Sequence, residues 1–578
     1  MNNIEKIILT GILYLIFFSC AAVWGLSYDN WQLREQLKWV SPLFLEMNFF
    51  LIFIGIIVNW DSFRMVIQKI DTRTGFIMLV IVLVGTLTAM FLAPRTHKIY
   101  YDEDIYLNIG QNIANLKTAG MCNEGEHIYG KYFCHRLEYN KQPNGWPYLI
   151  SVILRIFGTS HLACHLMNNF IWGLSALAVF FIGYLLFEDK NAGIFGALIF
   201  ILMPEGLIWS NTTSAEPSSA LWVSLALLAV IFFAKTPENR SLFLVAVLLP
   251  FAFQFRPESI LIVLPVGLVL ILMIPKEFLK QRTYLFILLF LVLTLPHFIH
   301  LYAVRGEGWG AVGESKFALK YFEENFRVNS LFYFKNKRFP LFFTLLFFTG
   351  VFMPKLNPGK NGETVRTATF SFFWKEKTVV FSWFLAFWGI FLFFYAGSYN
   401  YGADVRFSLL SYIPLGVLAG FGAAALSRWA TERLNWEWSS CGMTILILIC
   451  FLSFMPYIRA IGQEAWGARA DHEYAEIMAE KLPPNSLVLT HNPNMFLLWG
   501  KNAAQASIAS QNTPHLRNLF KRFPGGIYFH YNFWCNVSNP AQRSFCDNIL
   551  EKFETTEILS FQEREYKYSL HKLSLSKD

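Results

Sequence analysis

Long apolar runs follow one another from the N-terminus to about residue 460. A helix needs about 20 predominantly apolar residues to cross the hydrocarbon core of a bilayer, and most of the runs approach or reach that length. The pattern predicts thirteen membrane-spanning helices, at residues 7–27, 41–59, 75–94, 163–187, 191–209, 217–234, 241–255, 257–274, 283–304, 339–354, 378–397, 407–427 and 441–459.

The last 119 residues have a different pattern, with short strand-like runs between turn residues. These runs lie at residues 486–491, 527–531, 556–561 and 566–574. We therefore predict an α-helical polytopic membrane protein with a small C-terminal α/β domain. The expected parts are two additional N-terminal helices (1–74), a main membrane domain (75–459) and a C-terminal domain (460–578).

Composition supports a membrane protein. Of the 578 residues, 54% are hydrophobic and only 15% are charged, with a mean hydropathy of +0.39, whereas soluble proteins carry about 25% charged residues. An ordinary soluble protein is therefore excluded. The net charge of +8 is not gathered into a basic tract dense enough for nucleic acid, so we expect no nucleic-acid partner.

The basic residues indicate which loops face the cytoplasm. Lysine and arginine concentrate in four loops, at 60–74, 275–282, 355–377 and 428–436, and cytoplasmic loops are the ones enriched in these residues. With a cytoplasmic N-terminus and an odd number of spans, the region after residue 460 lies outside. We expect a multi-pass protein of the cytoplasmic (inner) membrane, with its first run kept as an anchor.

Two close cysteine pairs lie in the regions assigned to the outside. These pairs are Cys122 with Cys134 and Cys535 with Cys546. In an oxidising compartment such pairs favour disulfides, each worth about 2–3 kcal/mol. The alternative is four unrelated free thiols.

The outer loop 95–162 contains three consecutive acidic residues near its start, Asp102, Glu103 and Asp104. Isoleucines follow at four-residue spacing from 105 to 113, which predicts an amphipathic helix at the membrane surface. The acids could simply complement the positive end of the helix dipole. A carboxylate at this place is nevertheless held by a helix and would be available for chemistry.

Three cations are expected on the same side of the membrane, Lys141, Arg256 and Arg406. Any one of them could be an interfacial residue that extends to lipid headgroups. Together with a carboxylate they match what transfer from a lipid phosphate requires. The carboxylate removes a proton from an acceptor hydroxyl, and the cations stabilise the departing phosphate.

Four short motifs resemble a known family. They are Asp102-Glu103-x-x-Tyr106, Lys141 with Pro143, Glu216-Pro217, and Arg256-Pro257-Glu258. Their order resembles the GT-C superfamily over residues 75–430, in the branch of protein O-mannosyltransferases and lipid A aminoarabinose transferases. Those enzymes use a polyprenyl-phosphate sugar at the outer membrane face.

The resemblance implies roles for individual residues. It implies that Asp102 is the catalytic carboxylate, with Glu103 beside it. It also implies that Lys141 binds the phosphate of the lipid donor, assisted by Arg256 or Arg406. Supporting roles fall to four residues, Asp104, Tyr106, Glu216 and Glu258.

Two features depart from the family pattern. In the family the acidic motif follows the first span, whereas two extra spans precede it here. A third acid, Asp104, also competes for the role of base. On a helix Asp104 points about 200° away from Asp102, while Asp102 and Tyr106 are four residues apart and share a face, which favours Asp102.

Two histidine pairs have the spacing of metal ligands on a helix, His161 with His165 and His297 with His300. We interpret them as histidines at the water interface of a span. No Asp-x-Asp motif of the kind that holds a nucleotide sugar through a metal stands out. We therefore expect a lipid-linked donor, no cofactor and no obligatory metal.

The sequence favours an inverting glycosyltransferase that moves a sugar from a polyprenyl phosphate to a lipid, glycan or protein acceptor. Loop 305–338 and the C-terminal domain would form the walls of its site. A transporter or lipid flippase is the main alternative, although Glu46 is the one acid clearly deep in an apolar run. A glycan ligase or polymerase with a lipid-pyrophosphate donor is a third possibility.

Overall fold

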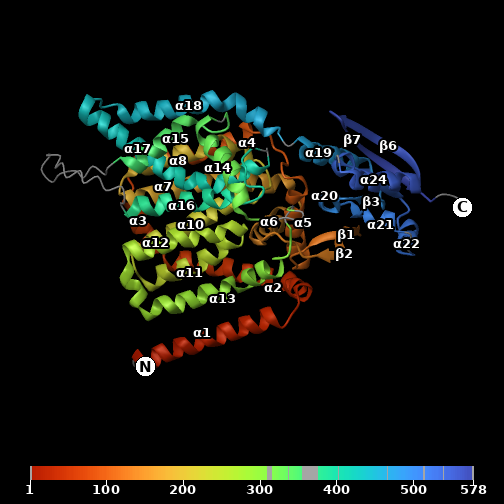
Figure 1. Cartoon of the computed structure of the whole chain (residues 1–578), viewed down its shortest axis with the longest axis horizontal. Coiled ribbons are helices and arrows are strands. Elements are labelled where there is room, and N and C mark those ends of the chain that lie inside the picture. The colour runs from red at the N-terminus through yellow and green to blue at the C-terminus, as the bar shows by residue number, and fades with distance from the viewer. Residues whose placement is uncertain are drawn as a thin grey trace.

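The computed structural model contains a block of roughly parallel helices with a smaller α/β domain at one end (Figure 1). It describes residues 3–308, 311, 315–335, 337–353, 375–400, 403–464, 466–511, 514–537 and 539–575. The N-terminus lies at the end of the block opposite the domain, so the long axis of the molecule runs along the helices.

Every one of the thirteen predicted runs lies on helical structure. The helices of the block are α1 (Asn3–Leu26), α2 (Asn30–Val58), α3 (Trp60–Gln68), α4 (Thr72–Leu92), α6 (Gly145–Phe157), α7 (His161–Phe187), α8 (Lys190–Ile201), α9 (Pro204–Ser210), α10 (Glu216–Lys235), α11 (Asn239–Phe253), α12 (Val263–Met273), α13 (Gln281–Ala303), α14 (Phe322–Lys335), α15 (Leu341–Phe352), α16 (Lys375–Gly389), α17 (Leu409–Leu434) and α18 (Ser439–Gly462). Short 3₁₀ turns precede or join several of them, η1 (Pro257–Ile262), η2 (Pro275–Leu279), η3 (Leu319–Tyr321), η4 (Ile390–Leu392) and η5 (Asp404–Ser408).

Eight of the described helices are long and apolar enough to cross a membrane, and the count rises to nine if the bent pair α8 and α9 is one span. The two halves of that pair meet at 62°, where Pro204 starts the second half. Four further apolar helices have 10–17 residues. The polytopic helical fold is thus confirmed, with several spans shorter than a full bilayer crossing.

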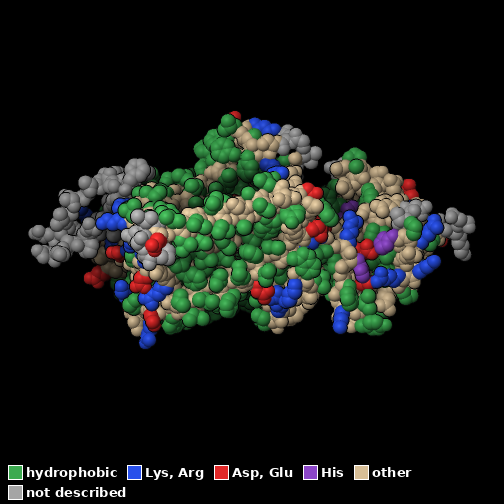
Figure 2. All heavy atoms as spheres, turned by 90° about the horizontal axis from the view of Figure 1, so that it is seen from below, with side chains coloured by type: hydrophobic (Ala, Val, Ile, Leu, Met, Phe, Trp, Pro, Cys, Tyr) green, Lys and Arg blue, Asp and Glu red, His purple; other side chains and the backbone are tan. Residues whose placement is uncertain are grey.

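Apolar side chains cover the middle of the helical block, and charged side chains gather toward its two ends (Figure 2). The predicted basic loops 60–74, 275–282 and 428–436 all lie at the end away from the C-terminal domain (Figure 1). Most of the fourth loop, residues 354–374, falls outside the described residues. This distribution is that of a protein with an apolar belt between two aqueous faces.

The C-terminal domain contains one mixed sheet of seven strands. In sheet order the strands are β2 (Lys131–Glu138), β1 (Met121–Ile128), β4 (Asn502–Gln505), β3 (Leu487–Thr490), β5 (Ile527–Tyr531), β7 (Tyr566–Ser574) and β6 (Glu554–Glu563). Strand β3 pairs in parallel with β4 and β5, and the other pairs are antiparallel. All four predicted strands are present.

Six helices belong to this domain. They are α19 (Trp466–Lys481), α20 (Pro493–Leu498), α21 (Ser507–Ser510), α22 (Pro514–Arg522), α23 (Phe533–Asn536) and α24 (Pro540–Lys552). They pack on the faces of the sheet and bury two apolar clusters, one of which includes Cys535 and Cys546.

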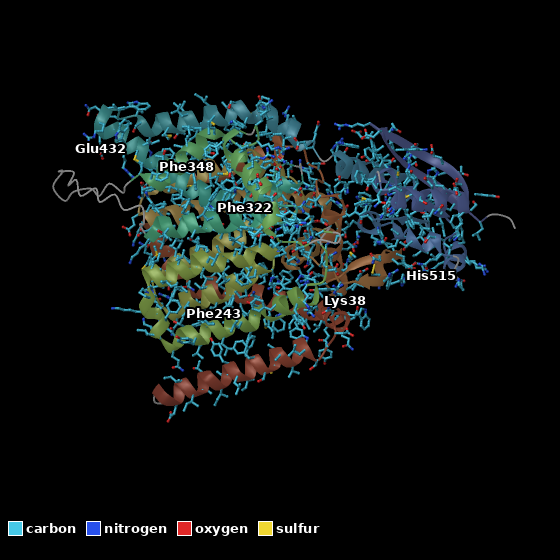
Figure 3. All side chains as sticks on the ribbon, in the orientation of Figure 1. Lys38, Phe243, Phe322, Phe348, Glu432 and His515 are labelled. Carbon is cyan, nitrogen blue, oxygen red and sulfur yellow. A yellow bond between two sulfur atoms is a disulfide. The ribbon has the colours of Figure 1, made fainter. Side chains whose placement is uncertain are left out.

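The sheet is completed by a hairpin that comes from the loop at residues 95–162. Strand β1 pairs with β4 through Glu124 and Gly125, so two distant parts of the chain form one sheet. The hairpin also contacts the helical block, because the Lys38 ammonium donates to the carbonyl of Leu137 at 2.9 Å. Lys38 lies where helices and domain meet (Figure 3). The sequence did not predict this hairpin.

Both predicted disulfides are present. Cys122–Cys134 joins the two strands of the hairpin, with Cα atoms 5.8 Å apart. Cys535–Cys546 joins α23 to α24, with Cα atoms 5.6 Å apart. Each bridge closes a short loop on the side of the molecule that carries the C-terminal domain.

Helix α5 (Tyr100–Leu116) forms where a surface helix was predicted, but its surroundings differ. It packs against α6 on one side and against α19, α20 and β1 on the other. Its buried amides take up backbone groups of the next segment: Asn108 accepts from the Cys122 N–H at 2.8 Å, and Asn112 donates to Gly120 at 2.6 Å. The sequence did not predict this second contact, in which polar groups such as Asp104 bind the C-terminal domain through Asn492.

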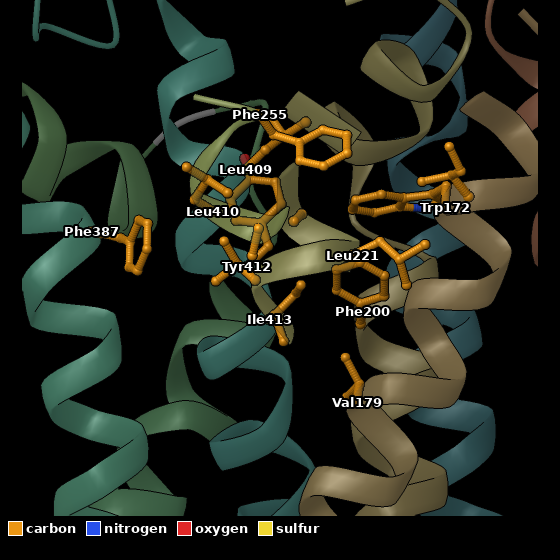
Figure 4. Packing of buried hydrophobic residues seen from close by; sticks show 14 of the residues in the cluster. Trp172, Val179, Phe200, Leu221, Phe255, Phe387, Leu409, Leu410, Tyr412 and Ile413 are labelled. Carbon is orange, nitrogen blue, oxygen red and sulfur yellow. The ribbon is translucent and has the colours of Figure 1, made fainter. Parts of the chain in front are cut away.

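Helix α17 lies against α8 at unusually close range. A Cβ atom on Gly420 would come within 2.3 Å of the backbone nitrogen of Gly196, so only glycine permits this approach, as in other membrane helix pairs. Aromatic and aliphatic side chains from α7, α8 and α17 belong to one buried apolar cluster (Figure 4). Trp172 and Phe200, for example, lie 4.1 Å apart between ring centroids. The packing fixes the start of α17, next to Arg406.

Cysteine labelling tests the predicted orientation. In a background without the free cysteines, Ser510→Cys should react with an impermeant maleimide in sealed cells, and Lys69→Cys should react only after the cells are permeabilised. Both positions are exposed, and they lie at opposite ends of the molecule. Labelling of Lys69→Cys but not of Ser510→Cys in sealed cells would reverse the orientation.

Candidate functional site

A cavity of about 540 Å³ lies at the end of the helical block that faces the C-terminal domain. The described residues around it include five cations and three carboxylates. The cations are Lys141, Arg256, Arg305, Lys316 and Arg406, and the carboxylates are Asp102, Glu258 and Asp404. Apolar side chains complete the wall, among them Leu261, Leu301, Phe317, Phe391, Phe394 and Phe407. The cavity therefore combines an excess of positive charge with a large apolar surface.

Asp102 occupies the first turn of α5 and lines the cavity. Its removal from bulk water raises the pKa of the carboxyl group, although the charges of Arg406 and Lys141 act in the opposite direction. Tyr106 lies one turn later, is 3% exposed, and is close enough to Asp102 to be affected by its charge. As the spacing predicted, these two residues share a face.

Glu216 organises two of the cations. Its Oε1 lies 2.5 Å from Nη1 of Arg256 and 3.0 Å from Nε of Arg406, and it is 1% exposed. Glu258 holds the other side of the first guanidinium, at 2.6 Å from Nε. The two carboxylates raise the pKa of Arg256 despite its burial. The guanidinium groups are thus held in fixed positions from behind, and both line the cavity.

The segment before α6 brings Lys141 to the same cavity. The Gly145 N–H donates to the carbonyl of Gln254 at 2.7 Å, and a Cβ atom on Gly145 would lie 2.5 Å from that oxygen. The Tyr139 hydroxyl is 2.8 Å from His300 Nδ1 and accepts from Asn144 at 3.0 Å. These contacts hold the segment close to Arg256, which is two residues from Gln254.

Glu103 faces away from the cavity. One carboxylate oxygen accepts from the backbone N–H groups of Lys98 and Ile99 at 2.6 and 3.1 Å. The other accepts from the N–H and the hydroxyl of Thr213 at 2.7 and 3.0 Å. With no exposed surface, this carboxylate joins the start of α5 to the turn before α10.

Asp104 also lies away from the cavity. Its Oδ1 is 3.4 Å from His97 and 3.2 Å from His472, and its Oδ2 accepts from Asn492 at 2.9 Å. Burial would raise the pKa of Asp104, but the two histidines hold it well below its usual range. Of the three acids at the start of α5, only Asp102 lines the cavity.

The cavity also contains charged residues to which the sequence assigned no role. Arg305 and Lys316 belong to the segment that was expected to form a wall, and Asp404 precedes Arg406 on η5. The basic character of residues 305–338 was a usable signal for the first two. The sequence did not connect any of them with Asp102, because more than 200 positions separate them.

The two histidine pairs lie in different parts of the molecule. His297 and His300 are on α13, where His300 contacts Tyr139. His161 belongs to a group with His97 and His472. The i, i+4 spacing of His161 and His165 therefore did not identify its nearest histidine partners.

Fold and site together define a polytopic membrane protein with an anion-attracting, partly apolar cavity under an α/β domain. Residues 141–300 match the family model for dolichyl-phosphate-mannose–protein mannosyltransferase. No curated protein sequence matches the chain.

Solved structures of similar fold extend over most of the chain. ArnT from Cupriavidus metallidurans bound to undecaprenyl phosphate is 13% identical with a TM-score of 0.54, over 87% of this chain and 98% of ArnT. The apo form of the same protein is also 13% identical, with a TM-score of 0.52 and the same coverage of both chains. A further similar structure is the oligosaccharyltransferase AglB from Archaeoglobus fulgidus in complex with an inhibitory peptide and a dolichol-phosphate. It is 10% identical with a TM-score of 0.49, and the match covers 86% of this chain and 74% of AglB.

At this level of identity the similarity to ArnT shows a shared fold. The predicted resemblance to the GT-C superfamily is confirmed, and the chain has a GT-C glycosyltransferase-like fold.

Glu103→Gln tests the structural role of the second acid. The amide can accept fewer and weaker hydrogen bonds than the carboxylate, so the folded state should lose about 1–3 kcal/mol. Purified protein in detergent should show a lower melting temperature. Glu323→Gln, at an exposed acid, is the control and should melt like the wild type. An unchanged melting temperature for Glu103→Gln would return Glu103 to the candidates for chemistry.

Proposed function

We propose that this chain is an inverting glycosyltransferase that moves one sugar from a polyprenyl phosphate to an acceptor hydroxyl or amine at the outer face of the cytoplasmic membrane. The observation that carries the proposal is the meeting of Asp102 with Lys141, Arg256 and Arg406 around one cavity. A base and a set of phosphate-binding cations are the two groups that this reaction needs.

The reaction is a single displacement. The acceptor oxygen or nitrogen bonds to the anomeric carbon, and the bond from that carbon to the phosphate oxygen breaks. The proton of the acceptor goes to Asp102, and the polyprenyl phosphate leaves with the bonding electrons. One displacement inverts the anomeric centre.

The environment of Asp102 suits a base. Burial raises its pKa from the ordinary carboxyl value, so it holds a proton more strongly than an exposed aspartate. The nearby cations limit this rise. They also stabilise the negative charge that builds up on the phosphate as the sugar leaves, so they contribute most in the transition state.

The wall of the cavity favours a lipid-linked donor. Arginine and lysine can bind a phosphate, while Leu261, Leu301 and Phe391 offer apolar surface for the first isoprenoid units. The undecaprenyl phosphate bound by ArnT supports the same donor class. A volume of about 540 Å³ lies in the range of small-ligand sites, which favours a single sugar over a long glycan.

We propose that no metal acts in this step. Five cationic side chains already surround the place where the phosphate would lie, and they supply the charge that a divalent ion supplies elsewhere. The acceptor is a lipid, glycan or protein that reaches the cavity from the side of the C-terminal domain.

The charged residues of the helical block fit a transporter function less well than the proposed transferase function. Glu46, the acid deep in an apolar run, lies 2.9 Å from Arg155 and keeps 53% of its side chain exposed. It is therefore compensated at the side of the block and does not line the described cavity. A ligase with a lipid-pyrophosphate donor needs the same residue types and remains the second candidate.

Asp102→Asn tests the base. The amide has nearly the same shape but cannot take the proton, so transfer should fall by at least about 100-fold. Binding of the polyprenyl-phosphate sugar should be nearly unchanged. Both quantities can be measured with purified protein in lipid vesicles.

Asp104→Asn provides the matched control, because it changes the neighbouring acid that faces away from the cavity. It should keep far more transfer activity per folded molecule than Asp102→Asn. The reverse order of activities would assign the base to Asp104.

Lys141→Ala tests the grip on the donor phosphate. A charge-assisted hydrogen bond to phosphate contributes about 1.5–3 kcal/mol, part of it only as negative charge develops. The variant should therefore show weaker donor binding and a lower kcat, each by about 3- to 12-fold. Lys141→Arg should retain part of the activity, because it keeps the charge.

Lys481→Ala, at an exposed lysine of the C-terminal domain, is the control and should behave like the wild type. Each variant should be assayed with a polyprenyl-phosphate sugar and separately with a nucleotide sugar. Unchanged kinetics of Lys141→Ala, or activity with the nucleotide sugar alone, would contradict the proposed donor.

A further inference from the structure

Three histidines from separate parts of the chain meet behind the start of α5. His97 lies between α4 and α5, His161 is the first residue of α7, and His472 lies on α19 of the C-terminal domain. Each offers a ring nitrogen, and the three atoms lie within 4.8 Å of one another. None of the three lines the donor cavity, so the cluster is separate from the proposed transfer chemistry.

Three ring nitrogens of this cluster are buried with no hydrogen-bond partner among the described residues, both nitrogens of His161 and Nε2 of His97. Nδ1 of His97 and Nδ1 of His472 face Asp104, at 3.4 and 3.2 Å. His97 is only 1% exposed. A buried polar group that makes no hydrogen bond costs about 1–3 kcal/mol, and three such atoms at one place indicate that something else satisfies them.

A carboxylate stands on one side of the cluster. Asp104 Oδ1 is 3.4 Å from Nδ1 of His97 and 3.2 Å from Nδ1 of His472. In metal sites the ring nitrogen that does not bind the ion usually faces a carboxylate or carbonyl, which fixes the ring. Asp104 has this position for two of the three rings and leaves their Nε2 atoms for an ion.

The surroundings would keep an ion out of bulk water. The Trp499 ring lies over His161, with 5.9 Å between centroids, and 5.0 Å from His472. His97 and His472 are stacked at 3.8 Å, and they would tilt apart by side-chain rotation to direct one nitrogen each to a shared ion. An aromatic ring packed over the imidazole ligands is suited to a structural site whose metal ion exchanges slowly with solvent.

We propose that His97, His161 and His472 bind a divalent transition-metal ion, zinc(II) in the first place, with Asp104 as the positioning residue. Three imidazole ligands select zinc, copper or nickel over calcium and magnesium, which prefer oxygen ligands. This inference departs from the sequence-based expectation of no metal site, since that expectation considered only pairs of histidines on one helix.

The three ligands belong to three parts of the molecule. One precedes α5, one begins a helix of the membrane block, and one lies in the C-terminal domain. A shared ion would fasten the domain to the block at the back of the helix that carries Asp102. Its expected effect is therefore on the stability of this junction.

Metal analysis of the purified full-length protein tests the site. Protein expressed with added zinc and dialysed against zinc-free buffer should retain about one zinc per chain. His472→Gln should retain clearly less. His515→Gln is the matched control, because His515 is an exposed histidine of the same domain with a carboxylate, Glu124, at 3.1 Å (Figure 3). It should bind as much zinc as the wild type.

Two further measurements use the wild-type protein, so they test the site even if a variant folds poorly. Chelator-treated wild-type protein should melt at a lower temperature and recover on addition of zinc, and cobalt(II) should give the visible absorption of a low-symmetry nitrogen-ligated site. His161→Gln should lose both responses. If the wild type retains no zinc and shows neither response, or if His472→Gln and His161→Gln both bind like the wild type, the proposal is overturned.

Discussion

Three neighbouring carboxylates at the buried start of α5 constrain the whole molecule. A buried charge is tolerated only with compensating partners, and helical geometry sends Asp102, Glu103 and Asp104 in different directions. The cavity cations surround the first, the turn before α10 binds the second, and the histidines of two other segments face the third. The helical block and the C-terminal domain must therefore meet in one arrangement around this turn.

The charge of the cavity follows from the same principle. Glu216 and Glu258 lie against the guanidinium of Arg256 at 2.5 and 2.6 Å, so the cation remains charged in a largely apolar place. Because the carboxylates hold the guanidinium groups from behind, these groups need little rearrangement to meet an anion. Such preorganised charge is what stabilises a phosphate as a bond to it breaks.

The hairpin, α5 and the C-terminal domain form one layer over one end of the helical block. The hairpin β1–β2 extends the sheet of the C-terminal domain, and α5 supplies the amides that hold the hairpin in place. A disulfide in the hairpin and another between α23 and α24 restrain the two parts of this layer. The helix that carries Asp102 is consequently covered on both sides, which limits its movement relative to the cavity.

The sequence by itself determined the helices, the four late strands, the cysteine pairs and the divergence of Asp102 and Asp104 around the helix axis. Each of these depends on contacts or periodicities within a short stretch of chain, which local patterns report. Only the tertiary structure decided that the hairpin β1–β2 joins the C-terminal sheet, that α5 is covered on both faces, and that Arg305 and Lys316 line the cavity with Asp102. These outcomes join residues more than 150 positions apart, and a pattern of hydrophobic and polar positions contains no information on which buried polar group will find which partner.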